Sequence, residues 1–400
     1  MKSIIAATQE IDDLKLAVKE LSSQIKAKSS FAGNSIGIVH CDADVDVAEL
    51  GGLLSAELGI DVVGLTTTAT IERNQGYSDM GILLTVLTAD DVRFSVGSTG
   101  ELSNDSFPET IREAYKRASA GIPEKPGLIL SFSPYIANLT SENYVEVLDE
   151  ASGGVPVFGG VATDHYDLQY QKTFYNGQAF SRGLVFVLIS GKIKPVFAME
   201  HHFGEKTEKK GVITASRDNL VQMVGNQTFK DYVSSIVPVP DDELVIYHFQ
   251  STPFVMELPD FEKDEQPVVR ALCTIDHNTG AGGFLSKMPE GSTLYLNVFQ
   301  RNNLSESCKG AISTLLRQME ENKGYEYSMI FICTCNARHL LMADAKDLES
   351  CILTEELKNH PAGLNAMGFY GFGEMCPTGK RADGTAKNRF HNISFAVCAI

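Results

Sequence analysis

The chain has 400 residues, of which 43% are hydrophobic and 21% are charged, and its formal net charge is -17. This length and composition predict a folded protein of two or three packed units and exclude a disordered chain. The acidic charge repels phosphate backbones and anionic membrane surfaces. The basic pairs Lys209–Lys210 and Lys380–Arg381 are short and lack interleaved aromatic residues. We therefore expect neither nucleic-acid binding nor membrane binding.

The sequence favours a cytoplasmic location. The apolar run at residues 1–7 is too short for the core of a signal peptide, and no stretch approaches the roughly 20 apolar residues of a membrane helix. The eight cysteines are spread over a long chain and lie largely in apolar segments, which is typical of reduced, buried thiols.

An amphipathic helix is predicted first, from Ile11 to Ala27. Its apolar residues recur at alternating spacings of three and four, so one stripe runs along the helix. The stripe covers only about two heptads, which favours packing on the protein body over a coiled-coil arm. We expect residues 1–30 to form this leader.

An order of strand, helix, strand and strand then recurs three times. The three copies lie at residues 36–87, 128–189 and 329–397. Two further helices are expected after Ser106 and Ser305, because serine is a favoured N-cap residue. This pattern predicts an α+β fold with mixed or antiparallel sheets covered by helices and built from βαββ repeats. The Pro-rich stretch Val237–Asp242 predicts a boundary between two halves at residues 234–242.

Several catalytic motifs are nearly matched and fail. Gly373–Lys380 has one residue too many for a phosphate loop, and Arg381 stands where a magnesium-binding Ser or Thr is required. Gly280–Gly283 lacks the spacing of a dinucleotide site and predicts a hairpin turn. No Gly-X-Ser-X-Gly nucleophile elbow occurs. The sequence thus contains no readable active site.

The segment Cys333–His339 groups two thiols, a guanidinium and an imidazole. No second pair of ligands follows at metal-like spacing, so structural thiols are favoured over a metal site. A reactive thiol at Cys335 stays open, because a nearby cation such as Arg338 lowers the pKa of a thiol. His201 and His202 follow a strand and should face opposite sides, which disfavours joint metal binding.

Two regions carry a family resemblance. Val63–Ile71 and Phe158–Asp164 have the order of apolar strand and polar turn seen in the FIST family, named for F-box and intracellular signal-transduction proteins. The C-terminal segment Gly368–Met375, followed by His391 and Asn392, is the more specific signature. The chain resembles this family from about residue 35 to residue 400. The resemblance implies a FIST N-terminal domain at residues 31–233 and a FIST C-terminal domain at residues 234–400.

The resemblance implies a stand-alone sensory protein and not an enzyme. Its expected ligand is an amino acid or a related metabolite, and its message must pass to a separate signalling protein. Some family members resemble haem proteins that respond to nitric oxide, so a haem sensor using His165 or His391 is the alternative. A hydrolase that uses the Cys335 thiol is a third alternative.

The expected ligand site is a cleft between the two halves. Glycines at strand ends let a ligand approach the backbone, and neighbouring polar groups orient it. Arg338 could bind a carboxylate, and Asp164 or Glu374 could bind an ammonium group. If Arg338 faces solvent, its substitution should weaken an anionic ligand with little effect on the fold. The expected site residues are Gly159, Gly160, Asp164, Arg338, Gly371, Gly373, Glu374, His391 and Asn392.

Overall fold

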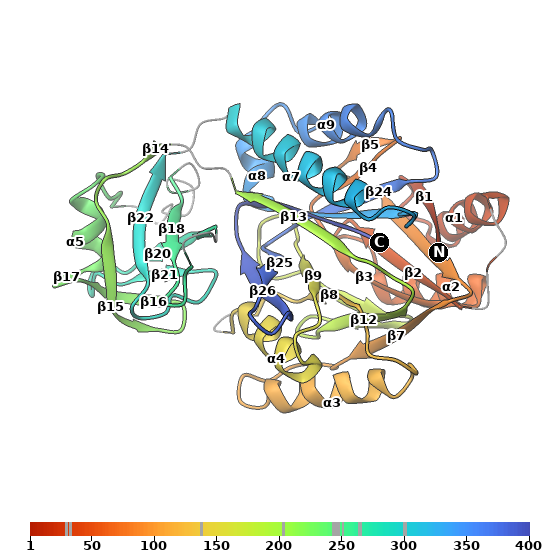
Figure 1. The fold of residues 1–400 in the computed structure, drawn as a ribbon, viewed down its shortest axis with the longest axis horizontal. Coiled ribbons are helices and arrows are strands. Elements are labelled where there is room, and N and C mark those ends of the chain that lie inside the picture. The colour runs from red at the N-terminus through yellow and green to blue at the C-terminus, as the bar shows by residue number, and fades with distance from the viewer. Residues whose placement is uncertain are drawn as a thin grey trace.

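The computed structural model describes residues 1–28, 31, 34–136, 139–201, 205–241, 249, 252–262, 266–298 and 302–400. Within these residues it contains three six-stranded sheets and a nine-stranded sheet. The six-stranded sheets form a large body with helices at its periphery, and the nine-stranded sheet lies to one side (Figure 1). The expected α+β class is confirmed.

The body consists of three repeats, each of which contains the predicted βαββ order with further elements before it and within it. In each repeat a strand and a helix precede the βαβ unit, and a hairpin is inserted before the last strand. The first repeat contains β1 (Lys2–Thr8), α1 (Leu14–Lys28), β2 (Asn34–Cys41), α2 (Val47–Leu58), β3 (Asp61–Thr66), β4 (Thr70–Glu72), β5 (Gly76–Ser78) and β6 (Ile82–Ala89).

The second repeat has the same element order as the first. It contains β7 (Val92–Ser98), α3 (Phe107–Ser119), β8 (Leu128–Ser133), α4 (Glu142–Ser152), β9 (Val157–Val161), β10 (Thr173–Tyr175), β11 (Gln178–Phe180) and β12 (Val185–Gly191).

The third repeat has two helices in its crossover. It contains β13 (Val196–His201), α7 (Asn302–Glu321), β23 (Met329–Cys335), α8 (Asn336–Met342), α9 (Leu348–Leu357), β24 (Asn365–Gly371), β25 (Glu374–Lys380), β26 (Ala386–His391) and β27 (Ser394–Ala399). The helix expected after Ser305 begins earlier, at Asn302, so Ser305 lies inside it and its hydroxyl donates to the Asn302 carbonyl.

The repeats interlock by exchanging their hairpins. Each six-stranded sheet contains one parallel pair, β2 with β3, β8 with β9 or β23 with β24. The hairpin β4–β5 joins the sheet of the third repeat, β10–β11 joins that of the first, and β25–β26 joins that of the second. Because every repeat completes the sheet of another, none of the three sheets forms from a continuous segment of chain.

Buried side chains follow this threefold arrangement. The inner faces of the three sheets share one apolar core, which includes Ile38, Leu130 and Phe331. Each outer face forms a separate core with its own helices: α1 and α2 on the first sheet, α3 and α4 on the second, α7 and α9 on the third. Strands that are buried on both faces have nearly continuous apolar sequences, and for this reason they could be predicted from the sequence. The apolar stripe of α1 packs on the body, as expected.

A small β unit, defined here as residues 205–298, is inserted between β13 and α7. The boundary expected at residues 234–242 lies in the stretch of sequence that this unit spans, and the division into two halves stays a prediction. Gly280 and Ala281 lie in the connection between two antiparallel strands, as expected of a hairpin, and Gly282 and Gly283 belong to the second of these strands. The unit contains β14 (Glu205–Lys206), β15 (Gly211–Arg217), β16 (Leu220–Val224), β17 (Gln227–Thr228), α5 (Phe229–Ser234), β18 (Phe254–Glu257), β19 (Val268–Arg270), β20 (Leu272–Ile275), β21 (Gly282–Phe284) and β22 (Thr293–Val298).

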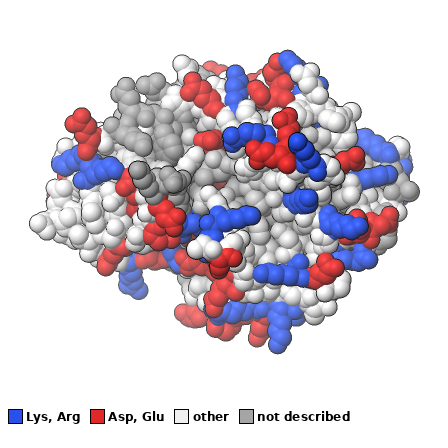
Figure 2. All heavy atoms as spheres, in the orientation of Figure 1, with Lys and Arg blue, Asp and Glu red and all other residues white. Residues whose placement is uncertain are grey.

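Acidic and basic side chains are intermixed over the face of the molecule shown in Figure 2. No helix among the described residues has the length and apolar character needed to cross a bilayer.

Candidate functional site

Most of the predicted site residues meet where the second and third repeats join. Strand β25 pairs with β9, so that Glu374 lies opposite Gly160. The amide of Val161 donates to the Gly373 carbonyl at 3.1 Å, and the amide of Phe372 donates back to Val161 at 3.1 Å. The hairpin exchange therefore brings the two glycine-rich segments together, although about 200 residues separate them in the sequence.

Protein atoms occupy the space that these glycines provide. A Cβ atom at Gly159, where φ is +149°, would lie 1.9 Å from the carbonyl oxygen of Ser131. A Cβ atom at Gly160 would lie 2.4 Å from the Cys333 sulfur. At Gly373, where φ is +148°, it would lie 2.2 Å from the ring of Phe390. The glycines are thus required for close packing between strands.

A buried polar cluster, which we define as Glu374, His391 and Asn392, lies beside these glycines. All three residues have an exposed fraction of 0%. Glu374 and His391 are paired across β25 and β26, and Asn392 follows directly. Among the described residues, Glu374 Oε1, His391 Nδ1 and Asn392 Nδ2 each lack a hydrogen-bond partner. A buried polar atom without a partner is costly and needs an explanation.

The other atoms of the cluster are held in place. Glu374 Oε2 accepts from the amide of Ser394 at 3.1 Å and from its hydroxyl at 2.6 Å. Asn392 Oδ1 accepts from the Ser286 hydroxyl at 2.7 Å. His391 Nε2 lies 3.1 Å from the Cys376 carbonyl oxygen. Each side chain is therefore anchored at one end and unpartnered at the other.

Burial controls the protonation of this cluster. Burial raises the pKa of Glu374 to about 8, although the Ser394 hydrogen bonds oppose the shift. Burial also lowers the pKa of His391 to about 3, against the effect of the Cys376 carbonyl. Near neutral pH we therefore expect both side chains to be mainly uncharged.

His201 lies next to the cluster, with its ring centre 5.3 Å from that of His391. The pKa of His201 is well below its usual value, mainly through burial and then through the charge of nearby groups, which include Arg270 and Arg338. His202 lies outside the described residues, so the predicted orientation of the two adjacent histidines stays a prediction.

Arg338 and Asp164 are already engaged in the structure. Arg338 is fully buried, and its Nε donates to Glu349 at 2.7 Å while Nη1 donates to the Ser307 hydroxyl at 2.9 Å. Arg338 does not face solvent. We therefore no longer expect that its substitution would leave the fold unchanged. Asp164 is also fully buried, and its carboxylate accepts from the amides of residues 168–170. Their roles in binding a ligand stay predictions.

The small β unit closes one side of the polar cluster. Arg270 Nη1 donates to the Phe390 carbonyl at 3.1 Å, and Nη2 pairs with Glu142 at 3.0 Å. The backbone of Lys287 also donates to Glu142, at 3.0 Å. A cavity of about 20 Å³ lies between this unit and the body, lined in part by Phe284 and Phe390. Such a space has room for about one water molecule.

Two larger grooves lie elsewhere on the surface. One, of about 960 Å³, is lined by residues of β13 and β25 and by Lys125 and Lys194. The other, of about 1000 Å³, is lined by residues of β1 and α7. The nine predicted site residues do not line either groove.

Cys333 and Cys335 are buried, and burial raises the pKa of both thiols well above the usual value. These properties agree with structural thiols and do not suit a thiolate nucleophile. The segment that resembled a phosphate loop, Gly373–Lys380, mostly forms strand β25.

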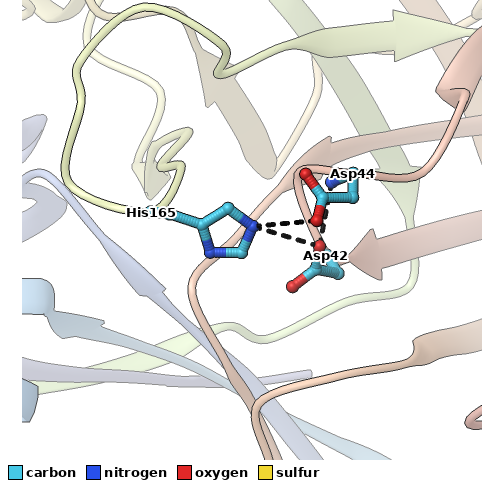
Figure 3. Close-up of side chains that lie close together, drawn as sticks. All are labelled: Asp42, Asp44 and His165. Atoms are coloured by element: carbon cyan, nitrogen blue, oxygen red, sulfur yellow. Dashed lines mark hydrogen bonds and ion pairs between the residues drawn. The ribbon is translucent and has the colours of Figure 1, made fainter.

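A second polar group was not found from the sequence. His165 Nε2 lies 3.4 Å from Asp42 Oδ1 and 3.5 Å from Asp44 Oδ2 (Figure 3). Asp42 directly follows β2, whereas His165 lies in the loop after β9. The signal in the sequence was weak, because the two loops belong to different repeats and meet only in the folded protein.

Both parts of the chain match known domains. Residues 35–227 match the FIST N domain, and residues 227–377 match the FIST C domain. The uncharacterized protein MJ1623 of Methanocaldococcus jannaschii is 22% identical over 373 residues, which are 84% of this chain and 67% of that protein. A crystal structure of cyanuric acid hydrolase from A. caulinodans aligns over 74% of this chain and 99% of its own, at 10% identity and a TM-score of 0.25, which is too low to inform function. Since the two domains together span residues 35–377, the chain belongs to the FIST family, whose domains serve generally as sensory, ligand-binding domains in signal transduction.

Proposed function

We propose that this protein is a cytoplasmic sensor that binds a small polar metabolite, an amino acid or a related compound, at the buried polar cluster. It passes the message to a separate signalling protein and is not an enzyme. The observation that carries the proposal is the set of three fully buried side chains, each with one unpartnered polar atom, next to the contact with the small β unit. A ligand with matching donors and acceptors would satisfy these atoms.

The chemistry of the cluster favours a ligand that carries an amine. Arg338 and Asp164 have their charges occupied by other protein groups, whereas Glu374 Oε1 has no partner among the described residues. An ammonium group placed at Glu374 would ionise this carboxyl and pair with it. The amide of Asn392 offers a donor for the carboxylate or another acceptor of the same ligand.

Entry of a ligand requires the small β unit to move, because the cluster is fully buried. The contacts that would open include the ion pairs of Arg270 with Glu142 and of Lys287 with Glu146, and the hydrogen bond of Ser286 with Asn392. They also include an apolar contact of Val255, Val269 and Tyr295 with Cys335 and Ile393. A ligand that prefers either the open or the closed arrangement would shift the balance between them, and a partner protein could read that change.

The residues present do not fit a haem group. His391 Nε2 lies against the Cys376 carbonyl and its ring packs against His201, so this side chain is held among polar groups. His165 faces two carboxylates instead of an apolar slot. A nitric-oxide sensor that uses either histidine as a haem ligand is therefore not favoured by the structure.

The proposal is tested by thermal-shift measurements of the whole chain against amino acids and related amines at several concentrations. A ligand that binds only the native state raises the melting temperature as its concentration increases. Glu374→Gln should abolish this response, whereas Glu124→Gln, at an exposed turn, should retain it. If no compound in a broad library stabilises the protein, or if Glu374→Gln responds like the wild type, the proposed site is wrong.

Proton release gives an independent check. Because the pKa of Glu374 is about 8, this carboxyl is mostly protonated in the empty protein at pH 7. Binding of an ammonium group should expel the proton, so affinity should rise by up to about tenfold per pH unit between pH 6 and pH 8. Calorimetry in buffers of different ionisation enthalpy should detect about one proton released per ligand. An affinity independent of pH in this range would exclude Glu374 as the partner of the amine.

A further inference from the structure

The group formed by Asp42, Asp44 and His165 lies apart from the buried polar cluster and carries different chemistry. One nitrogen and two carboxylate oxygens, one from each residue, lie within 4.8 Å of one another. Figure 3 shows the imidazole directed between the two aspartates. The donors come from the loop after β2 and the loop after β9, so two repeats contribute to the group.

The spacing of the donors suits a bound cation. Donors in neighbouring positions around a first-row metal, each about 2.1 Å from the ion, lie about 3 to 3.5 Å apart. His165 Nε2 lies 3.4 Å from Asp42 Oδ1 and 3.5 Å from Asp44 Oδ2. Two carboxylates and a neutral imidazole would also balance the charge of a divalent ion.

Asp42 supplies a second observation. Its exposed fraction is 4%, and Oδ2 has no hydrogen-bond partner among the described residues. Its other oxygen, Oδ1, accepts from the Asp44 amide at 2.8 Å and faces His165. A nearly buried carboxylate with one unsatisfied oxygen is expected to carry a counter-ion or a proton.

Backbone hydrogen bonds hold both loops against the segment at the end of β3, since the amide of Thr67 donates to the Cys41 carbonyl at 2.8 Å and the amide of Thr163 donates to the Thr66 carbonyl at 2.9 Å. The amide of Asp42 donates to the Gly81 carbonyl at 3.2 Å. On the other loop, the Asp164 carbonyl, next to His165, accepts from the Thr68 hydroxyl at 2.9 Å. The side chains of Asp44 and His165 are 77% and 48% exposed, so water can complete the coordination from the solvent side.

We propose that Asp42, Asp44 and His165 form a binding site for a divalent first-row transition-metal ion that links the first and second repeats. The mixture of imidazole and carboxylate donors suits ions such as Mn²⁺ better than a thiolate-seeking metal. This proposal goes beyond the sensor function and does not depend on it, because the residues differ from those of the buried polar cluster.

Mn²⁺ is the probe of choice, because its weak affinity for thiolates limits interference from Cys351, the exposed cysteine. The loss of the electron paramagnetic resonance signal of free Mn²⁺ reports binding to the full chain. We expect one saturable site per chain, weakened at least about tenfold by Asp42→Asn and by His165→Ala. His277→Ala is the matched control, because Nδ1 of His277 lies 2.8 Å from the Lys230 ammonium and this histidine belongs to no comparable group of donors among the described residues. This variant should bind Mn²⁺ like the wild type.

Circular dichroism and thermal unfolding establish that each variant is folded. His165→Ala alters a half-exposed side chain, so it keeps the test valid even if Asp42→Asn does not fold. The proposal is overturned if the wild type shows no saturable Mn²⁺ site, or if His165→Ala binds Mn²⁺ as tightly as the His277→Ala control.

Discussion

Replacing Glu374 by Gln should make the protein more stable at alkaline pH. The substitution keeps the shape of the side chain and an oxygen that can accept from Ser394, but it removes the carboxyl that ionises. In the wild type, burial raises the folded-state pKa of Glu374 from 4.5 to about 8. A glutamine at this position imitates the protonated carboxyl at every pH.

The direction of the effect follows from proton linkage. Between pH 4.5 and about 8 the folded state binds a proton at Glu374 that the unfolded state has lost, so wild-type stability falls as the pH rises. The contribution is fully present below pH 4.5 and is lost once the pH passes about 8. Since each pKa unit corresponds to about 1.4 kcal/mol, the total free-energy contribution is on the order of 5 kcal/mol.

Urea unfolding at pH 5, 6.5 and 8.5 measures this difference. The chain has no tryptophan, so far-ultraviolet circular dichroism is the suitable signal. We expect the two proteins to differ by less than about 1 kcal/mol at pH 5, and the variant to exceed the wild type by a few kcal/mol at pH 8.5. The pKa values of the buried histidines His391 and His339 are lowered to about 3 and about 4, so both proteins become less stable as the pH falls below 6.5. This loss is the same in wild type and variant and cancels in the difference between them.

A difference between wild type and variant that stays constant from pH 5 to pH 8.5 would refute the reasoning. It would mean that Glu374 is ionised in the folded protein with a partner outside the described residues, or that water reaches it. Glu124→Gln, at an exposed turn, serves as the control and should show no pH-dependent change.

Three further outcomes are expected. Gly159→Ala should lower the free energy of unfolding by more than about 4 kcal/mol or prevent folding, because its Cβ would lie 1.9 Å from a backbone oxygen. Gly59→Ala, whose Cβ would have no atom within 4 Å, should lower it by only about 1 to 2 kcal/mol in urea unfolding, and equal losses would contradict this. Arg338→Met should lower the free energy of unfolding by about 3 to 5 kcal/mol, because it leaves the buried Glu349 carboxylate without its partner. Adding Glu349→Leu removes this unpaired charge and should restore part of the stability, and no recovery in the double variant would argue against the buried pair. Iodoacetamide should modify the exposed Cys351 first, and rapid labelling of any buried thiol, read by mass spectrometry, would contradict the structure.

The strand and helix order was predictable because it rests on local patterns. The runs at residues 36–40, 128–132 and 329–334 are mostly apolar, as expected of parallel strands buried on both faces. The exchange of hairpins was not predictable, because the pattern of a short strand does not say which sheet it joins. The strand β1 was missed for a related reason, since its apolar run is short and its partner β6 lies 80 residues away.

The site was predictable in part. Glu374, His391 and Asn392 were singled out by a family signature, and the structure brings them together on one hairpin and the turn that follows it. Arg338 was proposed as a carboxylate ligand, but its buried partner Glu349, eleven residues away on the next helix, was not recognisable from the sequence. A side chain's partner depends on packing between helices, which a single sequence does not report.

The threefold arrangement also shows where the repeats depart from one another. In β2, β8 and β23, which each form the parallel pair of one sheet, the equivalent residues near the carboxyl end are His40, Phe132 and Cys333. His40 packs on Phe132 with ring centres 6.0 Å apart. Two residues further along each strand direction, the positions hold Asp42 in the first repeat and Cys335 in the third. Because the three repeats have the same backbone arrangement, side chains of similar volume would fill these positions equally well. Packing alone therefore does not explain why some of these side chains are polar. Departures from a consistent local pattern are expected at functional sites. By this reasoning the carboxyl ends of the strands, which carry both the Asp42 group and the glycine-rich turn before Glu374, are the part of the body on which ligand binding should be sought first.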